Sequence, residues 1–127
     1  MSLTADHLKA TFDAFNRHDV EGVMTHFAED CVFNTIAGDE AWGTRIEGRD
    51  AIAKAFTNVW TGIKDAQWAE HRHFVAGDRG VSEWTFRGTN PDGTRIDAQG
   101  VDLFTIRDGR IVEKKAFRKQ RPTLPAA

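Results

Sequence analysis

The chain has 127 residues and a formal net charge of −2, from 17 lysines and arginines against 19 aspartates and glutamates. This length suits one domain that buries a core without cross-links. The charge balance argues against nucleic acid as a partner. A single cysteine excludes an intrachain disulfide and favours a reducing compartment. The chain has nine phenylalanines, four tryptophans and no tyrosine, which excludes catalysis through a phenol.

Neither a secretion signal nor a membrane span is predicted. The N-terminal segment lacks a basic region followed by an apolar one, and no apolar run approaches the roughly 18 residues of a spanning helix. We therefore expect a cytoplasmic protein that does not bind a membrane.

Three helices are predicted in the first half of the chain. Thr4 can cap the first helix, whose apolar residues recur at spacings of three and four. Asp19 can cap a second, shorter helix. After a short strand that begins at 31–33 and a loop at 37–48, the apolar spacing predicts a third helix over 49–63.

From residue 66 onward the hydrophobic residues alternate, which indicates strands. Four strands joined as hairpins are predicted, over 68–76, 81–89, 95–107 and 111–119. Asp108-Gly109 is a favoured two-residue turn in which the glycine takes a positive φ. Helices segregated from an antiparallel sheet predict one α+β domain over residues 1–121, followed by a disordered tail at 122–127.

Three segments carry a resemblance to a known group of proteins: FNRHDVEGVMTHFAEDCVF at 15–33, IEGRDAIAKAF at 46–56 and GVDLFTIRDGRIVEKKAF at 100–117. In this order they resemble the nuclear transport factor 2-like superfamily, and within it the ketosteroid isomerase-like and SnoaL-like groups. The resemblance implies a cone-shaped fold in which three N-terminal helices pack on a curved antiparallel sheet around a central apolar pocket. It also implies a homodimer and a small apolar ligand.

The catalytic positions of these groups are matched only in part. Where ketosteroid isomerases place a general-base aspartate this chain has Thr35, and where they place a tyrosine on the first helix it has Thr11. Their protonated aspartate on a late strand corresponds to Asp102. SnoaL-type cyclases place a carboxylate near the end of the last strand, but residues 114–119 contain none. The resemblance therefore indicates the fold more firmly than the reaction.

Asp102 is the leading candidate for chemistry. A two-residue turn at 108–109 predicts that Asp102 lies opposite Lys115 on a mostly apolar face that points into the pocket. Asp102 is then either an acid, base or hydrogen-bond partner tuned by the ammonium, or half of a plain cross-strand salt bridge. A one-residue change in the loop would bring Lys114 or Ala116 opposite instead.

The first predicted hairpin has two faces of different chemistry. The aromatic face should be concave and carries Glu70, Arg72, Phe74, Trp84 and Phe86. Arg72 would then reach the pocket, or its charged end would extend to the rim. The other face carries His71 and His73, whose spacing suits a metal, with Glu83 across the turn. We expect this face to be exposed or to face a dimer partner, with no metal bound.

The sequence thus predicts a pocket protein that needs no cofactor. As an enzyme it would be an isomerase, cyclase or dehydratase acting on a small apolar carbonyl or polycyclic compound. Asp102 would transfer a proton, and Lys115 or Arg72 would stabilise negative charge. The alternative is a module that holds a hydrophobic ligand or a partner protein without turnover.

The pocket wall is assigned to apolar residues from several elements. Trp42, in the long loop, would act as a lid over the pocket or simply pack. The predicted wall consists of Phe12, Phe15, Phe33, Thr35, Trp42, Phe56, Trp84, Phe86, Phe104 and Phe117.

Overall fold

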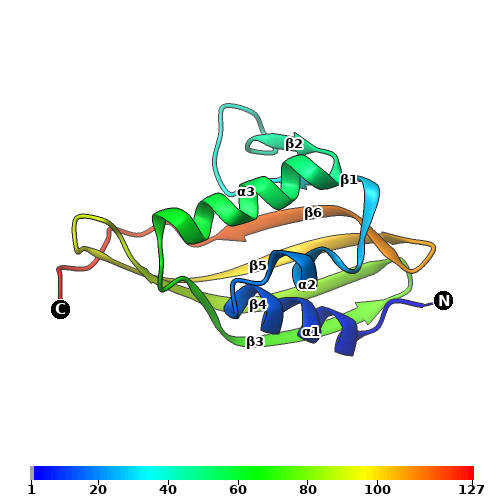
Figure 1. The fold of residues 1–127 in the computed structure, drawn as a ribbon, viewed down its shortest axis with the longest axis horizontal. Helices are drawn as coiled ribbons and strands as arrows, with labels where there is room; N and C mark the ends of the chain where they lie inside the picture. The colour runs from blue at the N-terminus through cyan, green and yellow to red at the C-terminus, as the bar shows by residue number, and fades with distance from the viewer. Residues whose placement is uncertain (1) are drawn as a thin grey trace.

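Helices cover one face of a single curved sheet in the computed structural model, which describes residues 2–127 (Figure 1). The helices are α1 (Ala5–Asn16), α2 (Val20–Met24) and α3 (Arg49–Gly62). The strands are β1 (Phe27–Asn34), β2 (Arg45–Glu47), β3 (Gln67–Ala76), β4 (Arg79–Thr89), β5 (Arg95–Arg107) and β6 (Arg110–Arg118).

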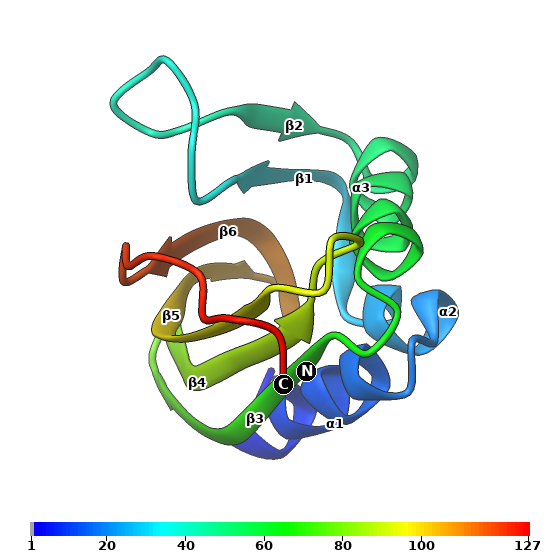
Figure 2. The same cartoon turned by 90° about the vertical axis from the view of Figure 1, so that its left-hand side faces the viewer.

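The six strands form one sheet in the order β2-β1-β6-β5-β4-β3. All neighbours pair antiparallel except β1 and β6, which run parallel. The sheet curls around α1 and α3, so that these helices close its concave side (Figure 2). This confirms the α+β cone. The loop predicted at 37–48 contains the extra strand β2, and β1 begins four residues earlier than predicted, at Phe27.

The helices begin where the sequence places their caps. Thr4 and His7 form a reciprocal pair: the Thr4 hydroxyl accepts from the His7 backbone N–H, and His7 Nδ1 accepts from the Thr4 backbone N–H. Asp19 caps α2 by accepting from the Gly22 N–H at 3.1 Å. The apolar faces of α1 and α3 are buried against the sheet, through Leu8, Phe12 and Phe15 and through Ile52, Phe56 and Trp60.

The last hairpin turns as predicted, but its register differs from the prediction. Asp108 and Gly109 both have positive φ, 53° and 75°, which is the geometry of a type I′ turn. Between the pairs Ile106↔Ile111 and Thr105↔Glu113, however, β6 contains one residue more than β5. This extra residue is Val112, at a β-bulge.

Because of the bulge, every residue of β6 after Val112 faces the opposite way from the prediction. Asp102 lies opposite Ala116, not Lys115, and Phe104 lies opposite Lys114. Lys114 is therefore buried on the inner face, and Lys115 points outward. The prediction that paired Asp102 with Lys115 is wrong, because it assumed an unbroken alternation of faces.

A second bulge reverses the faces of β3 from His71 onward. Between the pairs Ala69↔Thr85 and Arg72↔Glu83, β3 contains one residue more than β4. Glu70 stands there with φ 56°, a left-handed conformation that is unfavourable for a residue with a side chain. As a result His73 lies opposite Ser82 on the inner face, while Arg72 and Phe74 face solvent. The predicted faces of β3 were therefore exchanged.

The end of the chain returns to the start of β5, beyond the last residues that pair with β6. Leu124, in the segment predicted as a disordered tail, exchanges both backbone hydrogen bonds with Arg95. None of the helices formed by residues 2–127 has the length and apolar character needed to cross a membrane.

Candidate active site

A cavity of about 400 Å³ lies between α3, the end of α1 and the concave face of the sheet. Its wall is mainly apolar. Of the side chains predicted to form it, the structure places Phe15, Phe33, Thr35, Phe56, Trp84 and Phe86 there. Val59, Ile63, Trp68 and Ile96 are among the further apolar residues of the lining. The polar groups that line it are few, and Asp102, Lys114 and Arg118 carry the charge.

The other predicted wall residues lie elsewhere. Phe12 and Phe104 are fully buried in the core and do not line the cavity. Trp42 and Phe117 are exposed. Trp42 stacks beneath the Arg45 guanidinium at 4.7 Å and borders a separate surface hollow formed by its own loop, so it does not cover the cavity.

Asp102 and Lys114 form a buried ion pair at the cavity. Lys114 Nζ lies 3.0 Å from Asp102 Oδ1. The Lys114 side chain is 6% exposed and the Asp102 side chain 1%. The Trp84 indole N–H donates to Asp102 Oδ2 at 3.0 Å. The contact between Nζ and Oδ1 lacks hydrogen-bond direction, so Oδ1 has no hydrogen-bond partner among residues 2–127. The pair is therefore held by charge, with a free lone pair on one oxygen.

Aromatic rings surround the ammonium of this pair. Lys114 Nζ lies 4.2 Å from the ring centre of Phe33, and 5.4 and 5.7 Å from those of Phe56 and Phe15. The faces of such rings attract a cation. Burial raises the pKa of Asp102 against the opposing effects of Lys114 and Trp84. The carboxyl is therefore easier to protonate than an exposed aspartate.

Arg118 brings a second cation to the cavity. Its guanidinium lies 5.3 Å from the ring centre of Phe86, and burial lowers its pKa. It has no ion-pair partner within the described part of the chain. Lys114 was predicted only as the alternative neighbour of Asp102, and Arg118 was not predicted as a site residue. The bulge early in β6 brings both to the inner face, and no glycine marks it in the sequence.

Two residues predicted to act in the pocket lie outside it. Lys115 points away from the cavity and sits 4.0 Å from Glu113. Arg72 borders a shallow groove of about 590 Å³ on the outer face of the sheet, together with Glu70 and Glu83. That groove is larger than the cavity and shares Arg118 with it, but none of its titratable side chains is fully buried as Asp102 is in the cavity. We therefore take the inner cavity as the candidate site.

Comparisons with known proteins give the family and the fold of the chain. The model of the SnoaL-like domain matches residues 8–114. The chain belongs to the SnoaL-like family. No curated protein matches it. A nuclear transport factor 2-like protein of unknown function from Mesorhizobium loti is 30% identical; the match covers 91% of this chain and 90% of that one, with a TM-score of 0.70.

Two further solved structures share the fold. One, from Xanthomonas campestris pv. campestris, is provisionally described as a polyketide cyclase; it is 23% identical over 88% of this SnoaL-like chain and 87% of its own, with a TM-score of 0.77. The other is TerC, co-crystallized with polyporic acid; it is 21% identical over 90% of this chain and 89% of its own, with a TM-score of 0.74.

The SnoaL-like chain uses Thr35 and Thr11, the residues at the two unmatched catalytic positions, for structure. The Thr35 hydroxyl donates to the Ala37 carbonyl at 2.8 Å and accepts from the Thr44 N–H at 3.2 Å, which pins the loop at the cavity rim. The Thr11 hydroxyl donates to the His7 carbonyl within α1. Neither group can act as a general base near neutral pH. The chemistry of the cavity therefore depends on the charged side chains.

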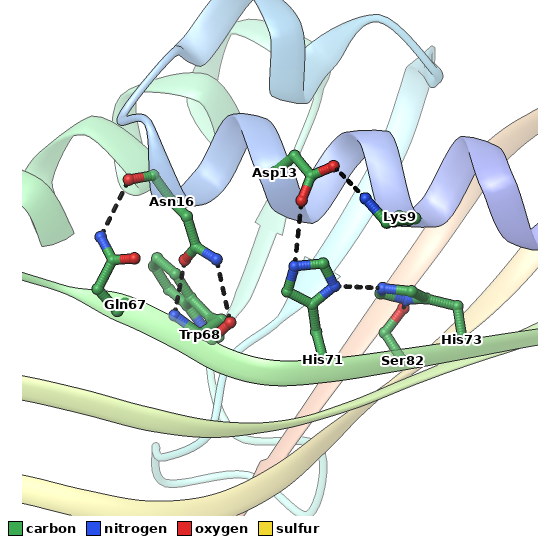
Figure 3. Close-up of polar contacts among 8 residues, drawn as sticks. All are labelled: Lys9, Asp13, Asn16, Gln67, Trp68, His71, His73 and Ser82. Atoms are coloured by element: carbon green, nitrogen blue, oxygen red, sulfur yellow. Dashed lines mark hydrogen bonds and ion pairs between the residues drawn. The ribbon is translucent and has the colours of Figure 1, made fainter.

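The histidines of β3 are built into a chain of polar contacts beneath α1 (Figure 3). His71 Nε2 lies 3.2 Å from Asp13 Oδ1, and His71 Nδ1 lies 2.7 Å from His73 Nε2. His73 Nδ1 lies 2.7 Å from Ser82 Oγ. The expectation of an exposed strand here is wrong, because the bulge at Glu70 turns both rings inward.

The arrangement around His71 and His73 is not that of a metal shell. Glu83, which the sequence placed across the turn from them, faces the other side of the sheet, and Ser82 stands in its place. Among residues 2–127, no group of three histidine, cysteine, aspartate or glutamate side chains could hold an ion.

Proposed function

We propose that this chain is an enzyme that moves a proton on a small apolar carbonyl compound, in the manner of an isomerase, cyclase or dehydratase. The observation that carries the proposal is the ion pair of Asp102 and Lys114, held in an apolar cavity of about 400 Å³. A cavity of this size suits a small ligand, and titratable groups at an apolar wall are typical of sites for proton transfer.

The pair contains one proton that either partner can hold. When that proton lies on Asp102, Lys114 is a neutral amine that can take a proton from the carbon next to a carbonyl group. The bond from carbon to hydrogen breaks, a nitrogen–hydrogen bond forms, and the electron pair moves to the carbonyl oxygen. The new ammonium and Arg118 stabilise that negative charge. The ammonium then returns the proton to another atom of the same molecule, which restores the amine.

The relatives support the ligand class. One structural neighbour is provisionally described as a polyketide cyclase and another was crystallized with polyporic acid. The second candidate function is a binding module without turnover. It is favoured by Thr35 and by the absence of an acid at 114–119, since those positions carry catalytic carboxylates in the groups this chain resembles.

A ligand screen followed by deuterium exchange separates the two functions. Cyclic ketones, with 2-tetralone as the reference probe, are incubated with the protein in D₂O, and incorporation next to the carbonyl is followed by NMR. We expect the wild-type chain to accelerate exchange, and Lys114→Met to lose at least roughly 100-fold of that rate. Lys115→Met is the matched control, because the neighbouring lysine points outward, and it should retain the rate.

Either of two results would decide against the enzyme. Binding of the ketones without any acceleration of exchange would support the binding module. Equal loss of activity in Lys115→Met and Lys114→Met would show that the inner-face pair does not carry the reaction.

A further inference from the structure

The ion pair of the cavity is nearly closed to water. Only 1% of the Asp102 side chain is exposed, although Asp102 lines the cavity. A proton on this carboxyl therefore has little direct contact with solvent. A bound ligand would also displace the water that touches Lys114. Any group that exchanges protons with the pair during a reaction must reach it through the protein.

A continuous set of proton-carrying groups runs from the surface toward Asp102. It starts at Asp13 on α1, whose side chain is 40% exposed and receives a hydrogen bond from Lys9 at 2.8 Å. It continues through His71, which is 13% exposed, to His73 and to the fully buried Ser82 (Figure 3). Exposure thus falls along the path toward the cavity.

The path ends beside Asp102. Ser82 and Asp102 are direct partners across β4 and β5, and both are buried on the inner face. Side chains of such pairs start from Cβ atoms about 5 Å apart. Asp102 Oδ1 lies 3.0 Å from Lys114 Nζ but has no hydrogen-bond partner within the described residues, so it keeps a lone pair that can carry a proton. No hydrogen bond joins these two side chains in the structure, and protonated Asp102 would supply one by donating to Ser82 Oγ.

The proton positions along the path follow from the contacts. Lys9 holds the pKa of Asp13 below its usual value, so this carboxylate accepts and His71 Nε2 must donate. When both rings are neutral, His71 Nδ1 accepts from His73 Nε2, and His73 Nδ1 accepts from the Ser82 hydroxyl. Burial lowers the pKa of His73 to about 4, which keeps this ring neutral near pH 7. Each hydrogen bond along the path is therefore donated in the same direction, from Ser82 toward Asp13 at the surface.

We propose that Ser82, His73, His71 and Asp13 form a proton relay that connects Asp102 with solvent while the cavity is occupied. Ser82 takes the proton of Asp102 and passes its own to His73 Nδ1. His73 passes its Nε2 proton to His71 Nδ1, and His71 passes its Nε2 proton to Asp13, which releases it to water. Each group gains one proton and loses one. Afterwards both rings carry the proton on Nδ1, which is the arrangement needed for the next proton to move inward.

The purpose of the relay rests on the proposed function, because it resupplies the pair that would act on the ligand. Its existence can be tested without a substrate, with the cavity filled by naphthalene, an apolar compound that has no carbonyl group and displaces the cavity water. The probe is hydrogen exchange at Lys114 Nζ, measured by NMR on the full chain labelled with ¹⁵N-lysine. The ammonium shares its protons with Asp102 and therefore reports how fast that site exchanges with water.

The expected result is that Ser82→Ala and His73→Gln slow the exchange at Lys114 roughly ten-fold or more, since neither replacement can accept one proton while giving another. Ser82→Thr keeps the hydroxyl and should restore the rate. Glu83→Gln, on the outer face of the same strand, is the matched control and should exchange like the wild type. The Trp84 indole resonance shows that each variant is folded.

If Ser82→Ala and His73→Gln are both folded and the exchange at Lys114 slows by less than roughly ten-fold in both, the relay is overturned. If the buried Ser82→Ala variant does not fold, His71→Gln nearer the surface provides the same test. The result is independent of the ketone experiment: slowed exchange without ketone turnover would leave the relay standing and remove the proposed enzyme. Ketone turnover together with unslowed exchange at Lys114 would remove the relay and leave the proposed enzyme standing.

Discussion

At the scale of single residues, the site depends on two opposite charges held out of water. Asp102 and Lys114 each lose hydration on burial, and their mutual attraction offsets that loss only while both are present. The Trp84 N–H satisfies one carboxylate oxygen, and three aromatic rings face the ammonium. The ion pair is therefore tolerated while both partners are present, and removing one of them lowers the free energy of unfolding.

This gives a prediction for stability. Asp102→Asn should lower the free energy of unfolding by about 3–5 kcal/mol, because it leaves Lys114 buried without its partner. The double variant Asp102→Asn with Lys114→Met should recover much of that loss. Urea unfolding of the wild type, both single variants and the double variant measures this. Additive losses in the double variant would show that the two side chains do not stabilise each other.

His73 gives a prediction for the dependence of stability on pH. Its pKa is about 4 in the folded chain, lowered by burial and then by the neighbouring charge of His71, against 6.5 as the reference value. The unfolded chain therefore binds a proton between pH 6.5 and 4 that the folded chain rejects, and stability falls as the pH falls through this window. The loss due to His73 is on the order of 2–3 kcal/mol.

The measurement compares urea unfolding of the wild type and His73→Gln from pH 7 to pH 4. The wild type should lose more stability than the variant over this range. Asp13 and Lys9 also act on this ring, but both remain in the variant, so the difference isolates His73. Parallel curves for the two proteins would contradict the lowered pKa.

At the scale of elements, two β-bulges determine which side chains reach the cavity. The extra residue in β6 brings Lys114 and Arg118 inward, and the extra residue in β3 brings in both histidines. Alternation of faces was predicted correctly within each continuous stretch. It failed at Val112 and at Glu70, because neither position carries the glycine that often marks a bulge in a sequence.

The bulge in β3 can be tested at Glu70. Its φ of 56° suits glycine and disfavours a β-branched side chain. We expect Glu70→Val to destabilise the chain by about 1–3 kcal/mol, and Glu70→Gly to be close to neutral. Thermal and urea unfolding measure both variants. In a regular strand valine would be favourable, so a gain in stability for Glu70→Val would contradict the bulge.

At the scale of the whole molecule, the outer face of the sheet is the surface left without a cover. Helices cover the concave face, while Phe74 and Phe117 are exposed on the convex face near the partly buried Val81 and Leu103. We propose that this face forms the homodimer expected from the sequence. Exposed aromatic side chains of this kind are enriched at protein interfaces.

Light scattering tests the homodimer. At micromolar concentration the wild type should have twice the chain mass of 14.2 kDa. The variant Phe74→Glu with Phe117→Glu should have the mass of one chain, because four charged side chains would meet in a two-fold interface. Arg72→Gln with Lys115→Gln, at neighbouring outward positions, is the control. A wild type with the mass of one chain would refute the dimer.

The sequence by itself determined the class of fold, the order of the elements, the caps at Thr4 and Asp19 and the turn at Asp108-Gly109. These depend on residues close together in the chain, whose spacing and backbone preferences can be counted. It also singled out Asp102, through the resemblance to the ketosteroid isomerase-like group and the apolar face predicted around this residue.

Only the tertiary structure decided which cation meets Asp102 and where the histidines point. Both depend on the register between strands, and one extra residue at a bulge exchanges the two faces for the rest of the strand. Lys114 and Lys115 are adjacent and identical in type, so composition and spacing cannot choose between them. The pairing of β6 with β5 makes that choice, because it places one lysine in the apolar cavity and the other in water.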